Sequence, residues 1–298
     1  MESRPAISGD TVILGDSDGM VYALDAASGF ARWTFEASGE IMGTPLVDGG
    51  RLYFMTTFNR VYAVDLKSGE WLWTHQRDIP PTFTVRGVAS PVTDGRLIYA
   101  CFSDGYVVAL NPQDGKENWK NLLKIDERLA DVDTTPVLDG DSIYVAAYDG
   151  ALYRLKRENG EVVWKYDRGG SVSAPALSGD YLFVGTSAGF LAAVDKTSGQ
   201  NVWSLDLRDK DKEHSLAGEP RRRLKVPSAP FASGGVVLTA TSQGFLYAAD
   251  ARTGAVLWRY FPGNGVNGGF EVSGDRLFFV GNGASVFAFR LRERGGAS

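Results

Sequence analysis

The stretch "YAVDLKSGEWLW" at residues 62–73 contains the pattern from which the fold of this 298-residue chain can be deduced. It has a short apolar segment, a polar turn of the form Asp-x-x-Ser-Gly, and a closing tryptophan. Five other segments match it, and they end at Trp33, Trp119, Trp164, Trp203 and Trp258. In all six, a glycine precedes the tryptophan by four residues and a proline precedes it by 28. An offset that recurs six times indicates an internal structural repeat.

Each copy of the repeat predicts four short strands. In the first copy they span 5–8, 11–16, 20–25 and 31–35, separated by turns that contain glycine. Asn59 stands where other copies have a turn glycine, and asparagine is the next best residue for left-handed backbone geometry. Four-stranded antiparallel units at a period of about 40–45 residues are typical of β-propellers. We therefore interpret the tryptophans as structural residues that pack between neighbouring blades.

The sequence predicts an all-β protein, a β-propeller of seven four-stranded antiparallel blades in a single domain that spans residues 1–298. The seventh unit has neither the proline nor the tryptophan, so we expect the last blade to be incomplete. We expect its third strand, "SVFAFRL" at 285–291, to be exposed, and further N-terminal residues of the natural protein to complete that blade. The approximate repeat units are 1–40, 41–86, 87–131, 132–170, 171–225, 226–265 and 266–298.

All variation in the length of the repeat falls between one tryptophan and the next proline. The three long linkers are 74–90, 120–135 and 204–229. In a four-stranded meander these linkers emerge on the same face as the turns between the second and third strands. Binding residues are often on loops that a rigid scaffold positions, so we expect function on this face.

The second linker carries two aspartates in "RLADVDTTP", residues 128–136. In an extended segment Asp131 and Asp133 point to one side, with Val132 opposed to them. Several roles are open to these carboxylates. They can cap turns or bind backbone amides, and they can form an ion pair with Arg86 of the preceding linker. A calcium site is a weaker reading, because it needs six or more oxygen ligands.

Composition narrows the functional classes. A net charge of −5 argues against a nucleic-acid partner. A single cysteine, Cys101, excludes an internal disulfide and a multi-cysteine metal site. The two histidines, His75 and His214, lie beside no recognisable nucleophile motif. The third linker ends in a basic run at 221–225, which is either a solvated loop or a contact for an acidic partner. The residues thus predict no enzyme and no cofactor.

The repeat, roughly A-x-D-x-x-[ST]-G-x-x-x-W, resembles that of the pyrroloquinoline-quinone (PQQ)-type propellers. One branch, the quinoprotein dehydrogenases, carries an adjacent cysteine pair, which a chain with one cysteine cannot provide. The other branch fits better. "FTVRGVASP" at 83–91 and "RLADVDTTP" at 128–136 resemble the paired motifs of the BamB family, the outer-membrane lipoproteins of the β-barrel assembly machinery.

This resemblance implies that the two loops lie side by side and dock on a periplasmic POTRA domain of BamA. The first loop would supply Phe83, Val85 and Arg86, with Phe83 and Val85 where the family has leucines. The second loop would supply Leu129, Asp131 and Asp133. Family members have eight blades, whereas this chain shows seven units.

The resemblance further implies a non-enzymatic scaffold in the periplasm, with no cofactor. Its partners would be the BamA POTRA domains and nascent outer-membrane proteins, and no nucleic acid. It would be tethered to the outer membrane only by an N-terminal lipid anchor that this sequence does not include. The alternative function is a PQQ-like sensor or ligand-binding propeller of a signalling protein, and a quinoprotein enzyme ranks third.

Overall fold

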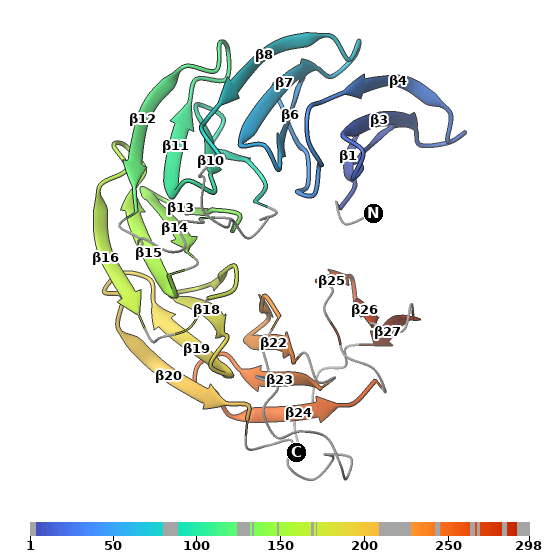
Figure 1. Cartoon of the computed structure of the whole chain (residues 1–298). Coiled ribbons are helices and arrows are strands. Elements are labelled where there is room, and N and C mark those ends of the chain that lie inside the picture. The colour runs from blue at the N-terminus through green and yellow to red at the C-terminus, as the bar shows by residue number, and fades with distance from the viewer. Residues whose placement is uncertain are drawn as a thin grey trace. The chain divides into compact units, whose positions relative to one another are not determined.

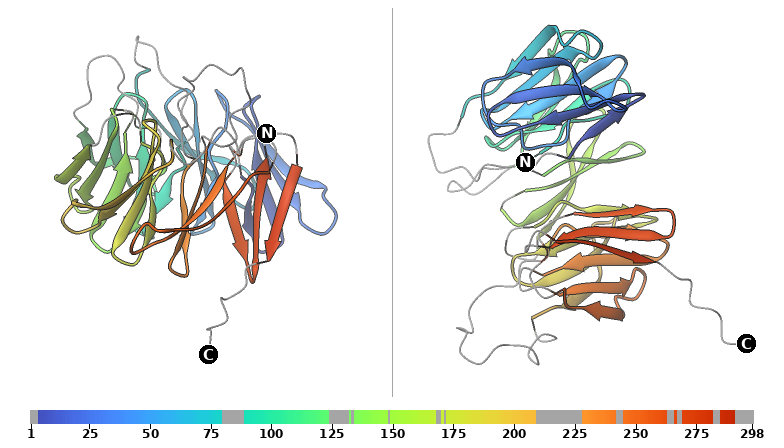
Figure 2. Two further views of the ribbon diagram at one scale, coloured as in Figure 1. Left: turned by 90° about the horizontal axis from the view of Figure 1, so that it is seen from below. Right: turned by 90° about the vertical axis from the view of Figure 1, so that its right-hand side faces the viewer.

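The computed structural model describes residues 4–79, 89–123, 132, 134–147, 149–167, 170, 172–208, 228–241, 245–262, 266, 269–281 and 285–290. The chain divides into two compact units, Met1–Lys165 and Tyr166–Ser298. Each unit is a series of antiparallel β-sheets whose strands follow one another in chain order (Figure 1). Figure 2 shows these sheets from two further sides.

The first unit contains four sheets of four strands each. The last of these strands, β16, extends two residues past the end of the unit at Lys165. The first sheet is β1 (Ala6–Ser8), β2 (Thr11–Gly15), β3 (Met20–Asp25) and β4 (Ala31–Glu36). The second is β5 (Leu46–Asp48), β6 (Arg51–Thr56), β7 (Arg60–Asp65) and β8 (Trp71–Gln76). The third is β9 (Val92–Thr93), β10 (Ile98–Cys101), β11 (Tyr106–Leu110) and β12 (Glu117–Leu122). The fourth is β13 (Val137–Asp139), β14 (Ser142–Ala146), β15 (Ala151–Lys156) and β16 (Val162–Asp167).

The second unit contains two four-stranded sheets and one of three strands among its described residues. The fifth sheet is β17 (Ala176–Ser178), β18 (Tyr181–Thr186), β19 (Phe190–Asp195) and β20 (Asn201–Asp206). The sixth is β21 (Phe231–Ser233), β22 (Val236–Ala240), β23 (Leu246–Asp250) and β24 (Val256–Tyr260). The last is β25 (Phe270–Ser273), β26 (Arg276–Gly281) and β27 (Ser285–Arg290).

The predicted seven-bladed propeller is therefore confirmed, including its incomplete last blade. The third strand of that blade, β27, is exposed as expected, and its Val286 is 74% exposed. Within the described part of the chain, we find no helix with the length and hydrophobicity that a membrane crossing requires.

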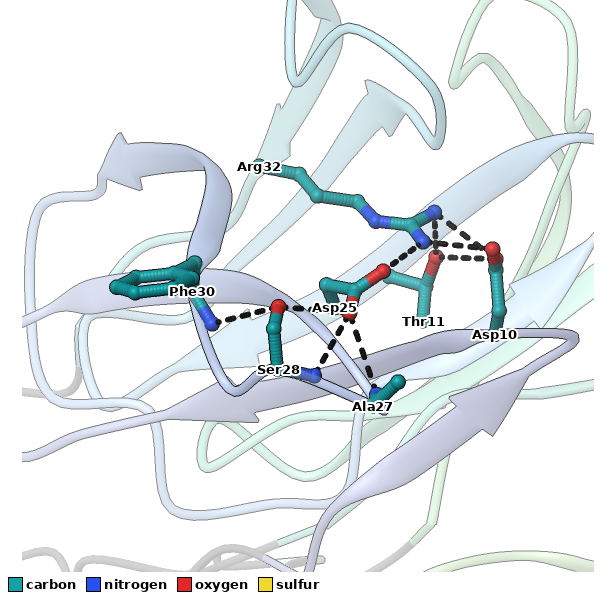
Figure 3. Close-up of polar contacts among 7 residues, drawn as sticks. All are labelled: Asp10, Thr11, Asp25, Ala27, Ser28, Phe30 and Arg32. Atoms are coloured by element: carbon teal, nitrogen blue, oxygen red, sulfur yellow. Dashed lines mark hydrogen bonds and ion pairs between the residues drawn. The ribbon is translucent and has the colours of Figure 1, made fainter.

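The Asp-x-x-[Ser/Thr]-Gly signature forms the turn between the third and fourth strands of a blade. In the first sheet, Asp25 Oδ1 accepts hydrogen bonds from Ala27 N, Ser28 N and Ser28 Oγ (Figure 3). Arg32 bridges Asp25 and Asp10, at 2.6 Å from each carboxylate. The hydrogen bonds from Arg32 and Ser28 lower the pKa of Asp25 well below its usual range. The same turn recurs at Asp65, Asp195 and Asp250.

The tryptophan of one blade packs on the glycine of the next, as the repeat predicts. Trp73 is 5% exposed, and its indole N–H donates to Pro112 O at 3.0 Å in the third sheet. A Cβ added at Gly115 would lie 2.5 Å from Trp73 Cε3. Trp33, Trp119 and Trp203 make the equivalent contacts with Gly69, Gly160 and Gly254. At these four positions the glycine is thus needed to leave room for the tryptophan ring of the preceding blade as well as for its turn.

Candidate functional site

The six residues that the sequence singles out lie outside the described residues. Phe83, Val85 and Arg86 belong to the segment 80–88, and Leu129, Asp131 and Asp133 belong to 124–131 and 133. Their roles therefore stay predictions. The structure does describe the residues from which both linkers start and to which they return, all in the first compact unit.

The two linkers end next to each other. Ser90, just before Pro91, donates its backbone N–H to Thr135 Oγ1 at 3.0 Å, and Thr135 stands just before Pro136. The Ser90 hydroxyl oxygen in turn accepts a hydrogen bond from Thr44 N at 2.8 Å. A hydroxyl on the residue before the proline thus connects consecutive blades. These residues are not among the six that the sequence singles out. What marks them in the sequence is that the second, third and fourth repeat units have a serine or threonine before the proline, whereas the fifth and sixth have alanine.

Hydrogen bonds hold the second linker at the residues before and after Asp133. Val132, which is expected to oppose the two aspartates, is fully buried, and its N–H donates to Phe102 O at 3.3 Å. The Thr134 hydroxyl donates to Ala146 O at 2.6 Å and accepts from Ala146 N at 3.1 Å. These bonds fix the residues that flank Asp133 to the third and fourth sheets.

The first linker starts at a largely buried ion pair. Arg77 Nε lies 2.6 Å from Asp104 Oδ2 in the turn between β10 and β11, and the two side chains are 12% and 13% exposed. The Arg77 guanidinium also lies 3.2 Å from Glu117 Oε1 and 4.0 Å from the centre of the Tyr106 ring. Burial raises the pKa of Asp104, and the nearby Arg77 offsets part of this effect. Sequence reasoning missed the pair, because its members are 27 residues apart.

Asn59, in the second sheet, contacts both the turn that carries Asp104 and the start of the first linker. Its φ of 53° confirms the left-handed geometry expected from the sequence. Its side-chain oxygen accepts hydrogen bonds from Ser103 N at 3.1 Å and Ser103 Oγ at 2.9 Å. Its side-chain nitrogen donates to Asp78 O at 2.9 Å. A glycine there would allow the backbone geometry but would lose all three bonds, so Asn59 also holds the first linker.

Two apolar side chains are exposed beside this linker start. Phe58, in the turn between β6 and β7, is 44% exposed, and Ile79 of the linker is 51% exposed. The Asn59–Asp78 hydrogen bond brings the segments that carry them together. Aromatic residues such as Phe58 are enriched at protein–protein interfaces relative to the rest of the surface.

His75 gives this region a pH dependence. Its side chain is 12% exposed, and its Nε2 lies 3.7 Å from Glu117 Oε1. Burial lowers the pKa of His75 from its ordinary value of 6.5, helped by Arg77 and Lys120 and opposed by Glu117 and a backbone hydrogen bond. The unfolded chain therefore takes up a proton at higher pH than the folded chain. The contribution of His75 to the free energy of unfolding is therefore fully present above the pKa that His75 has in the unfolded chain. It falls as the pH decreases through that value.

We expect a His75→Gln variant to lose less stability on acidification than the parent chain. Between about pH 6.5 and 5.5 the two curves of unfolding free energy should separate, with a slope difference of at most about 1.4 kcal/mol per pH unit. Urea unfolding at a series of pH values measures this. Near pH 8 the histidine is neutral in both states, so there the slopes should agree. Parallel curves over the whole range would show that His75 does not cause the dependence.

Comparisons with known proteins bear on the whole repeat array. A family model described as outer membrane protein assembly factor BamB matches residues 1–205 and 189–294. BamB of Nitrosomonas eutropha is 29% identical over 131 residues, which are 42% of this chain and 31% of that protein. The crystal structure of BamB from Moraxella catarrhalis superimposes with a TM-score of 0.83 at 21% identity, over 97% of this chain and 85% of that one.

The quinoprotein branch is also similar to this chain. Quinoprotein alcohol dehydrogenase PedH of Pseudomonas putida is 35% identical over 97 residues, which are 29% of this chain and 16% of that protein. The matched segments span about a third or less of the curated relatives named here. The repeat thus relates the chain to both branches, and the family model decides between them by covering nearly all of it.

Proposed function

Because this chain belongs to the family of the outer membrane protein assembly factor BamB, we propose that it is a non-enzymatic scaffold of the outer-membrane β-barrel assembly machinery. It docks on the periplasmic POTRA domains of BamA through the linkers 74–90 and 120–135. Phe83, Val85 and Arg86 of the first linker and Leu129, Asp131 and Asp133 of the second make the contact. The protein acts in the periplasm, held at the outer membrane by a lipid anchor, and helps to present nascent outer-membrane proteins.

The observation that carries this proposal is the hydrogen bond between Ser90 and Thr135. These residues lie at the C-terminal ends of the two sequence motifs, 83–91 and 128–136, each just before the closing proline. A docking surface made from two linkers requires that both linkers return to one place. The Ser90–Thr135 bond provides that place at their C-terminal ends.

The chemistry of the motifs suits a contact between proteins. Arginine together with exposed apolar side chains is characteristic of interface hot spots. The exposed Phe58 and Ile79 add apolar surface at the start of the first linker. Asp131 and Asp133 either orient Arg86 or meet a basic group of the partner, and complementary charge of this kind sets specificity and association rate.

A direct binding measurement tests the proposal. The purified 298-residue chain is titrated against immobilised periplasmic domains of BamA from the same organism. We expect saturable one-to-one binding that weakens moderately with salt, because the surface combines apolar groups with charges. A protein of the same fold from the quinoprotein branch serves as control and should not bind. The absence of saturable binding by this chain would overturn the proposal.

A further inference from the structure

The turn between β10 and β11, residues Phe102–Gly105, contacts both linkers. Asp104 pairs with Arg77 at the start of the first linker. Gly105 O accepts from Leu123 N, at the start of the second linker, at 3.0 Å. Phe102 O accepts from Val132 N, near the end of the second linker, at 3.3 Å. One four-residue turn thus touches three of the four described linker ends.

The backbone bonds of this turn are a general feature of the repeat. The equivalent turns of the first and fifth sheets accept from Ala37 N at Gly19 O and from Leu207 N at Gly189 O. The first sheet also shows a bond from Ile41 N to Asp16 O, which corresponds to the one from Val132 N. These bonds connect a turn to the linker that leaves its own blade. They do not connect one linker to the next.

The side-chain contacts of the 102–105 turn do make that connection. Arg77 lies in the linker that follows the second blade, and it pairs with Asp104 of the third blade. Asn59 of the second blade likewise reaches the third blade, where its side chain accepts a hydrogen bond from Ser103. The Arg77 guanidinium is further held over the Tyr106 ring, whose centre is 4.0 Å away. Arginine over an aromatic face is favourable, and the contact strengthens when water is excluded.

We propose that Arg77 is a positioning residue, and that its ion pair with Asp104 makes the 102–105 turn the common support that sets both docking linkers in one arrangement. This inference rests on the proposed function for its consequence in binding, but the coupling between the linkers can be measured without the partner. Removing one member of a buried ion pair leaves an uncompensated buried charge. In Arg77→Met the turn then rearranges to hydrate Asp104, which displaces the carbonyl that accepts from Val132. In Asp104→Asn the turn loses its ion pair with the first linker.

The test is amide hydrogen exchange on the full chain, read at Val132 and Ser90. We expect exchange of both amides to accelerate at least about tenfold in Arg77→Met and in Asp104→Asn, since local opening is what exchange reports. Arg77→Lys retains the charge and should fall between the parent and Arg77→Met. The double variant Arg77→Met/Asp104→Asn should accelerate exchange no more than either single change, because both remove one interaction.

Arg32→Met is the matched control. Arg32 also pairs with two carboxylates at 2.6 Å, but it lies in the first sheet and is 36% exposed. It should leave exchange at Val132 and Ser90 unchanged. If Arg77→Met and Asp104→Asn also leave both amides unchanged, or accelerate Ser90 alone, the turn does not couple the linkers and the inference is wrong.

Binding to the BamA periplasmic domains is the second measurement. Arg77→Met should weaken it at least about fivefold although the residues of the motifs are intact. A parent chain that does not bind BamA would refute the proposed function, while the exchange result would still decide the coupling. A parent chain that binds, with Arg77→Met binding equally well and its linker amides unchanged, would refute the positioning role alone.

Discussion

A Gly115→Ala variant should lose roughly 2–4 kcal/mol of unfolding free energy. The larger part of this loss should come from a clash with the Trp73 side chain of the preceding blade. Gly115 has a φ of 69°, which costs an alanine about 1 kcal/mol or more. The added Cβ would also lie 2.5 Å from Trp73 Cε3, and the ring is 5% exposed and has little room to move. Urea unfolding monitored by tryptophan fluorescence measures the loss.

Gly95→Ala separates the two causes. Gly95 has a similar φ of 82°, but a Cβ there would meet nothing within 4 Å. This variant should lose only about 1 kcal/mol, the cost of the backbone geometry. In a Trp73→Ala background, Gly115→Ala should cost no more than Gly95→Ala. Equal losses for Gly115→Ala and Gly95→Ala in the parent chain would show that the ring does not restrict this position.

An Arg86→Glu variant, and separately an Asp131→Ala/Asp133→Ala pair, should each weaken binding to BamA at least tenfold, a loss of about 1.4 kcal/mol. Reversing or removing charge at an interface hot spot affects the bound state, in which these groups lose water. Folding stability should be unaffected, because the residues belong to linkers and not to strands. Titration against the BamA periplasmic domains, alongside thermal unfolding, gives both quantities.

Two control variants match these changes at the opposite end of the sheets. Arg96→Glu makes the same charge reversal in the turn between β9 and β10. Asp139→Ala/Asp141→Ala removes two aspartates two residues apart, one at the end of β13 and one in the turn that follows it. Neither should alter binding. The variants at the predicted site have a structural role instead if they bind normally but melt at a much lower temperature. In that case Asp131 and Asp133 cap turns or pair with Arg86 inside the molecule.

The tryptophan–glycine contacts explain why the repeat tolerates insertions in one place only. Between the proline and the tryptophan, each residue has a fixed position relative to its own sheet. The ring, moreover, must reach the glycine of the next blade, as Trp33 reaches Gly69. After the tryptophan no such requirement applies, so the linkers vary in length. The part of the repeat that is free to vary is therefore the part on which we place function.

The sequence by itself determined the blades of this protein. Glycine turns at regular positions and a fixed proline–tryptophan offset are local information that a repeat displays many times. The same reading correctly gave Asn59 its left-handed geometry and the third strand of the last blade its exposure. It also marked the two linkers, because their lengths and motifs depart from the other copies.

Only the tertiary structure decided which polar groups meet at the base of those linkers. Arg77 and Asp104 are 27 residues apart, Asn59 and Ser103 are 44 apart, and Ser90 and Thr135 are 45 apart. Apart from Asn59, which marks a turn, each of these looks in the sequence like an ordinary polar residue of a loop. The physical reason is that turns and repeat spacings are local in the chain, so a sequence displays them, whereas a hydrogen bond or ion pair between blades depends on a distance of about 3 Å between groups far apart in the chain. That distance exists only after the blades have packed.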